Sequence, residues 1–443
     1  VGSEMCIRDR FGLAGLPPGQ PADGHDGRAM SVELFGCRPG PTNSLADVAG
    51  IGVGHAVCED GAGDSGVTMV VAPKSATASV DVRGGGPGTR ETDLLAPHNT
   101  VQAVHAIGLC GGSAFGLDAL TGAMAELENR GIGFPVLGPE HPDKLVPIVP
   151  GAVIFDLLLG RWDSRPDAAT GAMATAAALD DAVAGGEARR RARQTVQEMQ
   201  NAQDAQDAKY AQYAQSAQNG NVGAGLGASA GALKGGFGQA SAVLPEGAVL
   251  AGTTVAAGVV VNPQGAIFDP ETGLPWGSAA ELDGEFARYG LVDGLVDGEP
   301  VGAEGVKRLK SKNLLGTKIT ADMLAPKLNT TIGVVATDAP LTKAQAKRLA
   351  LAGHDGIARA IRPAHMPMDG DTLFAMATGE HTTGAGVDDV GMSVLSATVA
   401  NVVERAIVHV VLAAETAFGV HSWRDVVKGC LLYTSPSPRD LST

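Results

Sequence analysis

A polar triplet, Asn329-Thr330-Thr331, precedes an apolar run rich in β-branched residues that continues to Thr337. By itself this pattern is typical of a turn that leads into a buried strand. A second interpretation gives the triplet a chemical role. If the bond between Asn329 and Thr330 is cut, Thr330 becomes an N-terminal residue that carries a hydroxyl nucleophile and its own base, the free α-amine. Residues elsewhere in the chain decide between these two interpretations.

Three other sites carry side chains that could take part in such chemistry. Asn262 ends an apolar stretch and precedes a proline, so it is either a turn cap or an amide donor to a developing oxyanion. Asp369 and Asp371 flank Gly370 and indicate either a simple turn or two acids that hold an amine and tune its pKa. Lys234 lies in a Leu-Lys-Gly-Gly sequence, which is most simply a surface lysine near a turn.

Two glycine motifs resemble known catalytic or cofactor loops and fail in detail. Gly112-Ser113 could open a nucleophile elbow, but Phe115 occupies the place of the final glycine, so a tight turn from strand to helix is the simpler prediction. Gly223 and Gly225 could begin a dinucleotide loop, but the third glycine of that motif falls on Ala228. Neither motif therefore predicts a cofactor.

Histidines and acids near residue 370 could also be considered as metal ligands. His354, His365 and His381 approach Asp369 and Asp371 in sequence, but their spacing matches no zincin or EF-hand pattern. A Ser-His-Asp triad has no fixed order, and nothing in the sequence selects one. We therefore predict an enzyme that needs no metal and no other cofactor.

Composition limits the partners and the cellular setting. Of the 443 residues, 44% are hydrophobic and only 4% are aromatic, and the formal charge of −15 argues against nucleic acid or an anionic membrane as the main partner. No unbroken apolar run of about 18 residues is present, so we predict no membrane span. If Cys6 and Cys430 are left aside with the two foreign-looking ends, the small, scattered, odd set Cys37, Cys58 and Cys110 remains, which favours reduced thiols and a cytoplasmic protein.

The two ends differ in character from the rest of the chain. The first ten residues and the segment from Cys430 onward resemble translated sequencing-adapter sequence, and 11–29 is rich in Gly and Pro without a periodic pattern. We expect 1–29 to be a non-native or disordered leader and 430–443 a non-native tail. We also expect the Ala/Gln-rich stretch 189–219 to be an insertion, because alanine every third residue drifts around a helix and forms no fixed apolar face.

The elements that must position the candidate residues follow from periodicity. Apolar runs predict strands at 67–72 and 78–82, joined as a hairpin by a Pro73-Lys74 turn, and further strands at 255–262, 332–337 and 372–378. The polar stretch 271–327 is interpreted as an exposed connection. Helical spacing and caps predict four long helices, at 117–130, 167–184, 342–361 and 393–418. Strands in groups and helices in pairs favour an α+β protein with sheets inside and helices outside.

Several long blocks, in one order, resemble the DmpA-type aminopeptidases, also called peptidase family S58. This family includes β-peptidyl aminopeptidases and nylon-oligomer hydrolases. The resemblance extends roughly from Asn43 to Ala414. Its main carriers are DVAGIGVGHA (47–56), VDVRGGGPGTRETDLL (80–95), HAIGLCGGSAFGLDA (105–119), NTTIGVVATDAPLTKAQ (329–345) and HDGIARAIRPAHMPMDGDTLFAMATG (354–379).

The resemblance implies a fold and a set of roles. It implies a four-layer αββα sandwich that is similar to Ntn hydrolases but has its own connectivity, and a precursor that cuts itself between Asn329 and Thr330. The α chain would be 30–329 and the β chain 330–429 of one catalytic domain. Thr330 would be the nucleophile and Asn262 the oxyanion residue, with Asp369 and Asp371 near the new amine. Lys234 would be the active-site lysine.

This chain departs from the family pattern in two places. Phe155 stands where some members carry a tyrosine, and Lys234 comes two residues after the position that often holds the lysine. The resemblance still implies hydrolysis of amide bonds in small peptides, β-peptides or aminohexanoate oligomers by a homo-oligomer, a tetramer or larger, of α/β heterodimers. Two alternatives stay open: acyl transfer like that of ornithine acetyltransferases, and an uncut oligomeric scaffold without catalysis.

Overall fold

A computed structural model describes residues 36–58, 63–138, 140–198, 218–311, 329–381 and 386–430. The predicted leader, 1–29, lies outside the described residues, as does the predicted tail apart from Cys430. Most of the predicted insertion, 199–217, is outside them too, and its first ten residues continue a helix.

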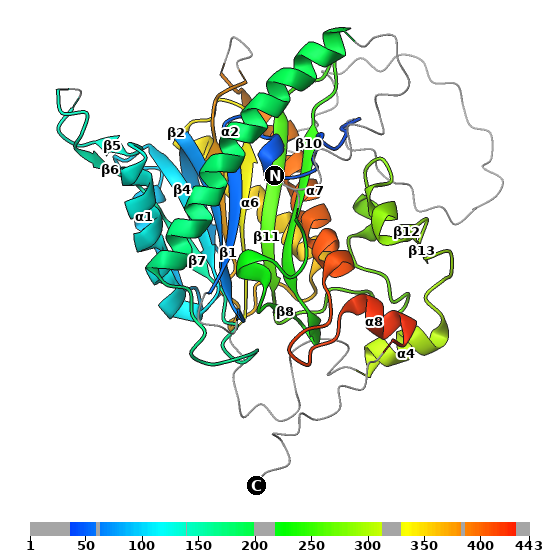
Figure 1. Ribbon diagram of the computed structural model, residues 1–443. Helices are drawn as coiled ribbons and strands as arrows, with labels where there is room; N and C mark the ends of the chain where they lie inside the picture. The colour runs from blue at the N-terminus through cyan, green and yellow to red at the C-terminus, as the bar shows by residue number, and fades with distance from the viewer. Residues whose placement is uncertain are drawn as a thin grey trace, which may run out of the picture.

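The described residues form four layers. Helices α1 (Ala119–Asn129) and α2 (Ala168–Glu198) cover one side of the strands, and α6 (Lys343–Ala360) and α7 (Asp389–Ala413) cover the other (Figure 1). Three separate hydrophobic clusters fill the spaces between successive layers, two of them beneath the helix pairs and the third between the two layers of strands. The predicted αββα sandwich is confirmed.

One nine-stranded sheet supplies both inner layers. Its strands run in the order β10 (Gly236–Val243), β11 (Thr254–Asn262), β14 (Thr330–Thr337), β15 (Thr372–Ala377), β2 (Gly66–Val82), β4 (Ala103–Cys110), β7 (Gly151–Val153) and β3 (Thr89–Arg90), and β1 (Gly52–Val57) also pairs with β2. β14 pairs antiparallel with β11 and parallel with β15, so it lies inside the sheet.

The long strand β2 joins the two inner layers and corrects the predicted hairpin. Its first residues, 66–71, pair with β1, whereas its last residues, 77–82, pair with β15. The register against β4 shifts between Val71 and Ala76, where Pro73 cannot donate to a ladder. A break in pairing that sequence reasoning interpreted as a turn is therefore an irregularity within one 17-residue strand.

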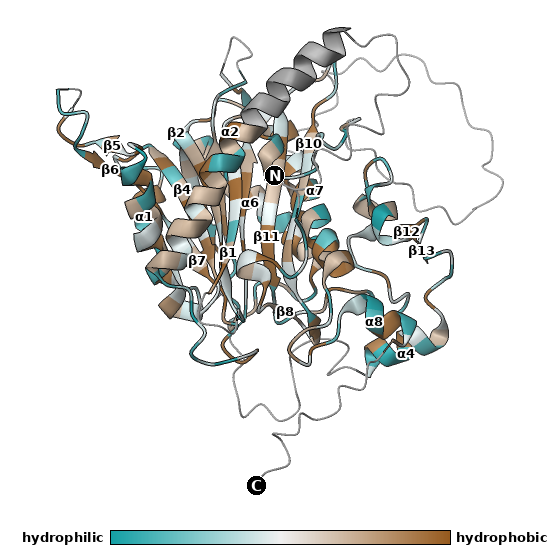
Figure 2. Ribbon diagram, in the orientation of Figure 1, coloured by the Kyte–Doolittle hydropathy of each residue, from teal (hydrophilic) through white to brown (hydrophobic). Residues whose placement is uncertain are grey.

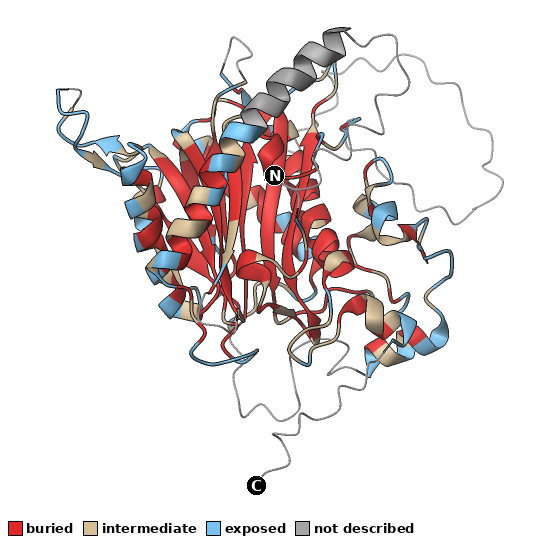
Figure 3. Ribbon diagram, viewed as in Figure 1, coloured by how far each residue is buried: buried red, intermediate tan, exposed pale blue. Residues whose placement is uncertain are grey.

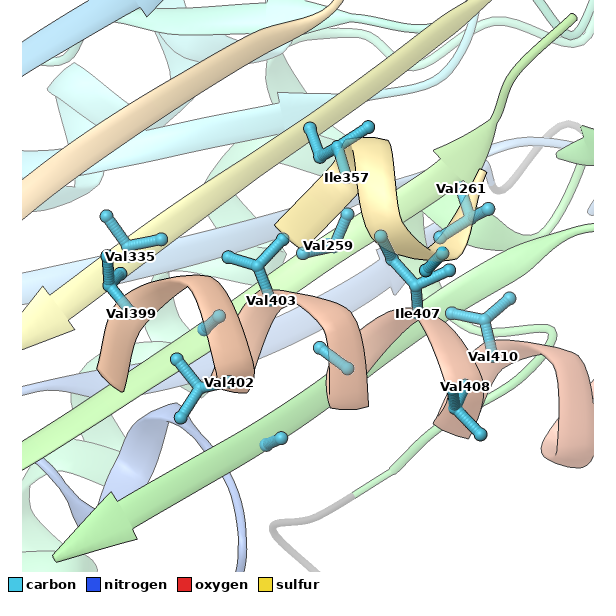
Figure 4. Close-up of a cluster of buried hydrophobic side chains, with 14 of the residues drawn as sticks. Val259, Val261, Val335, Ile357, Val399, Val402, Val403, Ile407, Val408 and Val410 are labelled. Atoms are coloured by element: carbon cyan, nitrogen blue, oxygen red, sulfur yellow. The ribbon is translucent and has the colours of Figure 1, made fainter. Parts of the chain in front are cut away.

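Alternation along the central strands separates the cores. Val334 of β14 belongs to the cluster between the strand layers, whereas its neighbour Val335 belongs to the cluster under α6 and α7. Figure 4 shows how valines of α7, including Val403, meet Val259 of β11 and Val335 in that cluster. Strands buried on both faces need continuous apolar runs, which explains the composition of β11 and β14.

Hydropathy and burial follow the same layering. Apolar residues concentrate in the long strands of the sheet (Figure 2), and these central strands are almost wholly buried (Figure 3). Among the described residues α7 is also the one helix long and apolar enough to cross a membrane, and 78% of its most apolar window is buried inside the protein. This helix contains no unbroken apolar run of about 18 residues, so the sequence did not indicate it as a membrane span. Its apolar composition is explained by its packing in the core.

The predicted helix at 342–361 is confirmed in detail. α6 begins after Thr342, whose side chain accepts a hydrogen bond from the backbone of Gln345 while Gln345 reaches back to the cap. Two other predictions are wrong. Thr330 and Thr331 belong to β14 and are not a turn. The stretch after 271 is not simply exposed, because Phe286 and Leu309 are fully buried in the core under α7.

That stretch forms several small elements beside the sandwich. They are η5 (Ser278–Ala280), η6 (Glu285–Tyr289), β12 (Leu291–Val292), β13 (Leu295–Val296) and α4 (Ala303–Lys310), which packs on α8 (Trp423–Lys428). The remaining short elements are the β5–β6 and β8–β9 hairpins, at 134–146 and 229–234, and the 3-10 turns η1 to η4.

Candidate active site

Thr330 and Asn262 face each other across the sheet. Thr330 is the first residue of β14 and Asn262 the last of β11, and the two are direct antiparallel partners. Both are buried, with exposed fractions of 4% and 1%. Two residues 68 positions apart in sequence are thereby fixed at the same end of neighbouring strands.

The intact Asn329–Thr330 bond is held by the segment that carries the two acids. The Asn329 carbonyl oxygen accepts a hydrogen bond from the Gly370 N–H at 2.8 Å and another from the Thr330 hydroxyl at 2.5 Å. The Asn329 N–H donates to the Met368 carbonyl at 3.2 Å. The Asn329 carbonyl therefore has a backbone donor on its oxygen and the hydroxyl of the candidate nucleophile beside it.

Asp369 and Asp371 organise the backbone around this bond. One oxygen of Asp371 accepts the Thr331 N–H at 2.7 Å, and the other accepts the N–H of His365 at 3.1 Å. Asp369 accepts the backbone N–H groups of Gln264 and Met366 at 3.1 and 2.9 Å. The two carboxylates thus tie β14 and the loop after β11 to one segment, and both are buried.

The glycine loop after β2 backs this segment. Gly86 donates its N–H to the Asp369 carbonyl at 2.8 Å. A Cβ on Gly84 would lie 2.2 Å from the Asp369 carbonyl oxygen, and one on Gly85 would lie 2.5 Å from that of Pro367. Glycine is needed here because two backbones approach more closely than any side chain allows.

The amide of Asn262 has a fixed orientation. Its oxygen accepts the Ser229 N–H at 2.9 Å, and its nitrogen donates to the Phe155 carbonyl at 3.1 Å. Each partner admits only one of the two ends of the amide, so the assignment of oxygen and nitrogen follows from chemistry. Phe155 therefore contributes to the site through its backbone, in place of a phenol hydroxyl.

Lys234 is fully buried, so its interpretation as a surface lysine is wrong. Its ammonium group donates to the carbonyls of Ala228 and Gly235 at 2.8 and 3.0 Å, with a longer contact to Gly225. Burial lowers the pKa of Lys234 to about 7, against the opposing charge of Asp156. Among the described residues no hydrogen bond joins Lys234 to Thr330. An indirect connection runs through Ser229, which pairs with Lys234 in the β8–β9 hairpin and donates its N–H to Asn262, the strand partner of Thr330.

Asp156 is a residue that the sequence analysis missed. Its carboxylate accepts the Gly112 N–H and the Ser65 hydroxyl, both at 2.7 Å. Burial raises the pKa of Asp156 to about 6, partly offset by these bonds and by Lys234. A single acid inside the apolar run VPGAVIFDLLL (149–159) was the available signal, since a buried carboxylate needs partners. Gly112 and Ser113 form the predicted tight turn, and its Gly112 N–H is the backbone donor to Asp156.

The histidines do not form a metal site. No group of three or more His, Cys, Asp or Glu side chains in the described part of the chain could hold a metal ion. His365 instead contacts Asp371, and its ring lies 4.9 Å from that of His354. His381 bonds to the Ala251 carbonyl, away from Thr330.

The pocket geometry places two surface depressions elsewhere. One of about 420 Å³ lies between α6 and α7 beside Met392, and one of about 370 Å³ lies beside Tyr289 and Arg424. Neither is lined by Thr330, Asn262 or the two acids. The candidate site is therefore identified by the types and contacts of its residues and not by the volume of a cavity.

Comparison with known proteins gives a consistent family. The profile of peptidase family S58 matches residues 43–189 and 188–424. An uncharacterized aminopeptidase of Mycobacterium leprae is 43% identical over 403 residues, which cover 88% of this chain and 95% of the relative. A 6-aminohexanoate-oligomer endohydrolase of Kocuria sp. is 28% identical over 372 residues, 82% of each chain.

Solved structures show the same fold at lower identity. A Burkholderia sp. beta-aminopeptidase matches with a TM-score of 0.54 at 22% identity, covering 89% of this chain and 97% of its own. The L-aminopeptidase D-Ala-esterase/amidase of Ochrobactrum anthropi, described as a variant of the Ntn hydrolase fold, matches with a TM-score of 0.54 at 20% identity. That match covers 88% of this chain and 95% of the other.

Proposed function

The chain belongs to peptidase family S58 and is an amide-bond hydrolase, and from this premise we propose that it cuts itself between Asn329 and Thr330 to expose Thr330 as its nucleophile. The observation that carries the proposal is the Asn329 carbonyl, whose oxygen lies within hydrogen-bond distance of both the Thr330 hydroxyl and the Gly370 N–H. These two contacts support an attack on that carbonyl, because they put the candidate nucleophile beside it and a donor on the oxygen where negative charge would develop.

Self-cleavage proceeds through an ester. The Thr330 oxygen attacks the Asn329 carbonyl carbon, and the Gly370 N–H stabilises the oxygen as negative charge develops on it. Breakage of the C–N bond transfers the acyl group to the Thr330 oxygen, and the nitrogen takes up a proton. Water then hydrolyses the ester, which leaves the Asn329 carboxylate and a free Thr330 amine.

The mature reaction uses the same oxygen on a substrate. The new amine, or Lys234 with its lowered pKa, takes the proton from the hydroxyl while the oxygen attacks the substrate amide. The Asn262 amide stabilises the oxyanion, the C–N bond breaks, and the proton passes to the leaving amine. Water then hydrolyses the ester and releases the acyl group. Asp369 and Asp371 orient the ammonium groups and bind a cationic substrate end. No cofactor takes part in these steps.

Substrate entry requires the cut. Thr330 is only 4% exposed in the uncut chain, with Asn329 lying over it. Departure of the Asn329 end opens the space in front of the nucleophile. The substrates that we propose are small peptides, β-peptides or aminohexanoate oligomers, supported by the names of the relatives and by two carboxylates suited to an amine. We place the enzyme in the cytoplasm as a homo-oligomer of α/β heterodimers, without nucleic-acid or membrane partners.

A panel of variants and substrates tests this proposal. Thr330→Ala should abolish both self-cleavage and hydrolysis of aminoacyl amides, β-peptides and aminohexanoate oligomers, a loss on the order of 10³-fold or more. Thr331→Val is the control, because only the backbone of Thr331 contacts Asp371 and its buried hydroxyl has no partner among the described residues. A Thr330→Ala protein that still splits after residue 329, or that still hydrolyses the panel, would refute the assignment.

A further inference from the structure

Behind the two acids lies a pair of histidines that the proposed reaction leaves unused. His365 precedes β15 and His354 belongs to α6, and their rings meet edge to face with centroids 4.9 Å apart and an interplanar angle of 69°. Their sequence spacing matches no known metal-site pattern. In the structure His365 contacts Asp371, and His354 contacts Asp81.

His365 holds Asp371 with two donors. Its backbone N–H and its Nδ1 approach the same carboxylate oxygen at 3.1 and 2.8 Å. A carboxylate can only accept, so Nδ1 carries the hydrogen. The other Asp371 oxygen accepts the Thr331 N–H, immediately after the candidate nucleophile. The place of this carboxylate relative to Thr330 is therefore set from the His365 side.

The backbone of His365 is adapted to this contact. Its φ of +57° lies in the left-handed region, which asparagine and glycine adopt at less cost than other residues. In this conformation the N–H and the ring Nδ1 of His365 both lie within hydrogen-bond distance of the same oxygen. A histidine that adopts the left-handed conformation next to the candidate site indicates a role beyond packing.

His354 supports the ring of His365 from within the protein. Its Nε2 lies 3.1 Å from the Asp81 carbonyl oxygen, which requires a hydrogen on that nitrogen. Burial lowers the pKa of His354 to about 4, so a neutral ring packs against His365. The Asp81 carboxylate is itself held by Lys347 and Arg83 at 2.7 and 2.8 Å. A continuous set of contacts thus links Asp371 to charged groups at the surface.

We infer that His365 is a positioning residue of the Thr330 site: its imidazole N–H holds the Asp371 carboxylate in the place from which that carboxylate orients the backbone at Thr331 and the amine released at Thr330. The inference rests on the proposed function. His365 touches neither the scissile carbonyl nor the substrate, and it acts through Asp371.

Two substitutions separate the hydrogen bond from the backbone conformation. His365→Asn keeps a residue that tolerates positive φ and offers an amide N–H near the place of Nδ1, whereas His365→Gly tolerates positive φ and offers no side-chain donor. The time course of self-cleavage is followed by intact mass, and kcat and KM are then measured for the cut enzymes. His381→Asn is the control, because His381 lies outside the site.

The expected result is rescue by the conservative variant. His365→Gly should slow self-cleavage and lower kcat by about 10- to 100-fold, the cost of one hydrogen bond to a charged group, with little change in KM. His365→Asn should stay within about threefold of wild type. Circular dichroism and melting temperature establish that both variants fold.

Two results would overturn the inference while leaving the proposed function intact: a His365→Gly protein that cleaves itself and turns over substrate at the wild-type rate, or a folded His365→Asn protein as slow as His365→Gly. If His365→Gly does not fold, the wild-type rate of His365→Asn supports the inference and a loss of rate refutes it. A wild-type protein that is never cut would instead refute the proposed function, and with it this role.

Discussion

At the scale of single residues, the sequence predicted candidate site residues most clearly where the type of side chain suits one particular chemical role. Thr330, Asn262, Asp369 and Asp371 all converge on one end of the central strands, although they are spread over 110 positions. Lys234 is buried, its pKa is lowered, and its ammonium group is hydrogen-bonded to backbone carbonyls. The order of residue types along the chain could not predict these contacts. The position of Lys234 relative to the site depends on the β8–β9 hairpin, in which each strand has two residues.

The sequence did not indicate Asp156 as a site residue, because its partners are far from it along the chain. Its carboxylate is satisfied by a backbone N–H and by a serine hydroxyl 91 residues earlier, and its charge acts on Lys234 without a direct bond. Such a role depends on how the fold brings together the four segments that carry Ser65, Gly112, Asp156 and Lys234. Only the isolated acid in an apolar run could have raised the question.

Asp156→Asn tests the electrostatic link to Lys234. The negative charge of Asp156 raises the pKa of Lys234, so its removal should lower that pKa further. If neutral Lys234 is the base, the acidic limb of the pH–rate profile near pH 7 should move to lower pH by about 1 unit. The asparagine oxygen can accept the Gly112 N–H, and its NH2 group can donate to the Ser65 hydroxyl oxygen. Asp163→Asn, an exposed acid nearby, should leave the profile in place.

At the scale of elements, periodicity and caps predicted most helices and the central strands. The capping box of α6 and the apolar runs of β11 and β14 are local signals, and the structure confirms them. β2 could not be predicted in the same way. Its pairing changes partners along its length, from β1 to β15, and such long-range choices leave no local pattern.

The segment between α6 and β15 supplies the backbone donor to the Asn329 carbonyl. A Cβ on Gly370 would lie 2.8 Å from both the Gly86 carbonyl oxygen and the Thr330 hydroxyl. Gly370→Ala should therefore displace the donor and slow self-cleavage by about 10²–10³-fold, the usual effect of losing one oxyanion donor. Time courses by denaturing gel measure the rate. Gly302→Ala, where a Cβ meets open space, is the control, and equal rates for the two variants would contradict this role of Gly370.

At the scale of the whole molecule, a buried charge cluster crosses the proposed cut. Glu285 of η6, before the cut, forms an ion pair with Arg405 of α7, after it, and accepts a hydrogen bond from Nε2 of His409 on the same helix. Burial raises the pKa of Glu285, but Arg405 and His409 outweigh it and hold that pKa well below the usual range. The αββα layers and this cluster would keep the two chains together once the bond is broken.

Glu285→Ala should reduce the free energy of unfolding by about 3–5 kcal/mol at neutral pH, because it leaves Arg405 buried without its partner. The measurement is chemical denaturation in a Thr330→Ala background, which keeps one covalent chain. A depressed carboxyl pKa stabilises above the unfolded value of 4.5 and loses that effect as pH falls. The difference between the two proteins should therefore shrink below about pH 4.5.

The matched control is Glu271→Ala, which removes an exposed carboxylate from the same part of the chain. It should change the free energy of unfolding by no more than about 0.5 kcal/mol. If Glu285→Ala behaves like this control, the cluster does not hold the two parts of the molecule together.

The central claim is that the chain cuts itself at one bond, and intact mass spectrometry of the purified wild-type protein tests it most directly. We predict two fragments, one ending at Asn329 and one beginning at Thr330, whose summed mass exceeds that of the full chain by one water. The Thr330→Ala protein should remain a single species. A wild-type protein that stays at full length after prolonged incubation, or that is cut at another bond, would contradict the account.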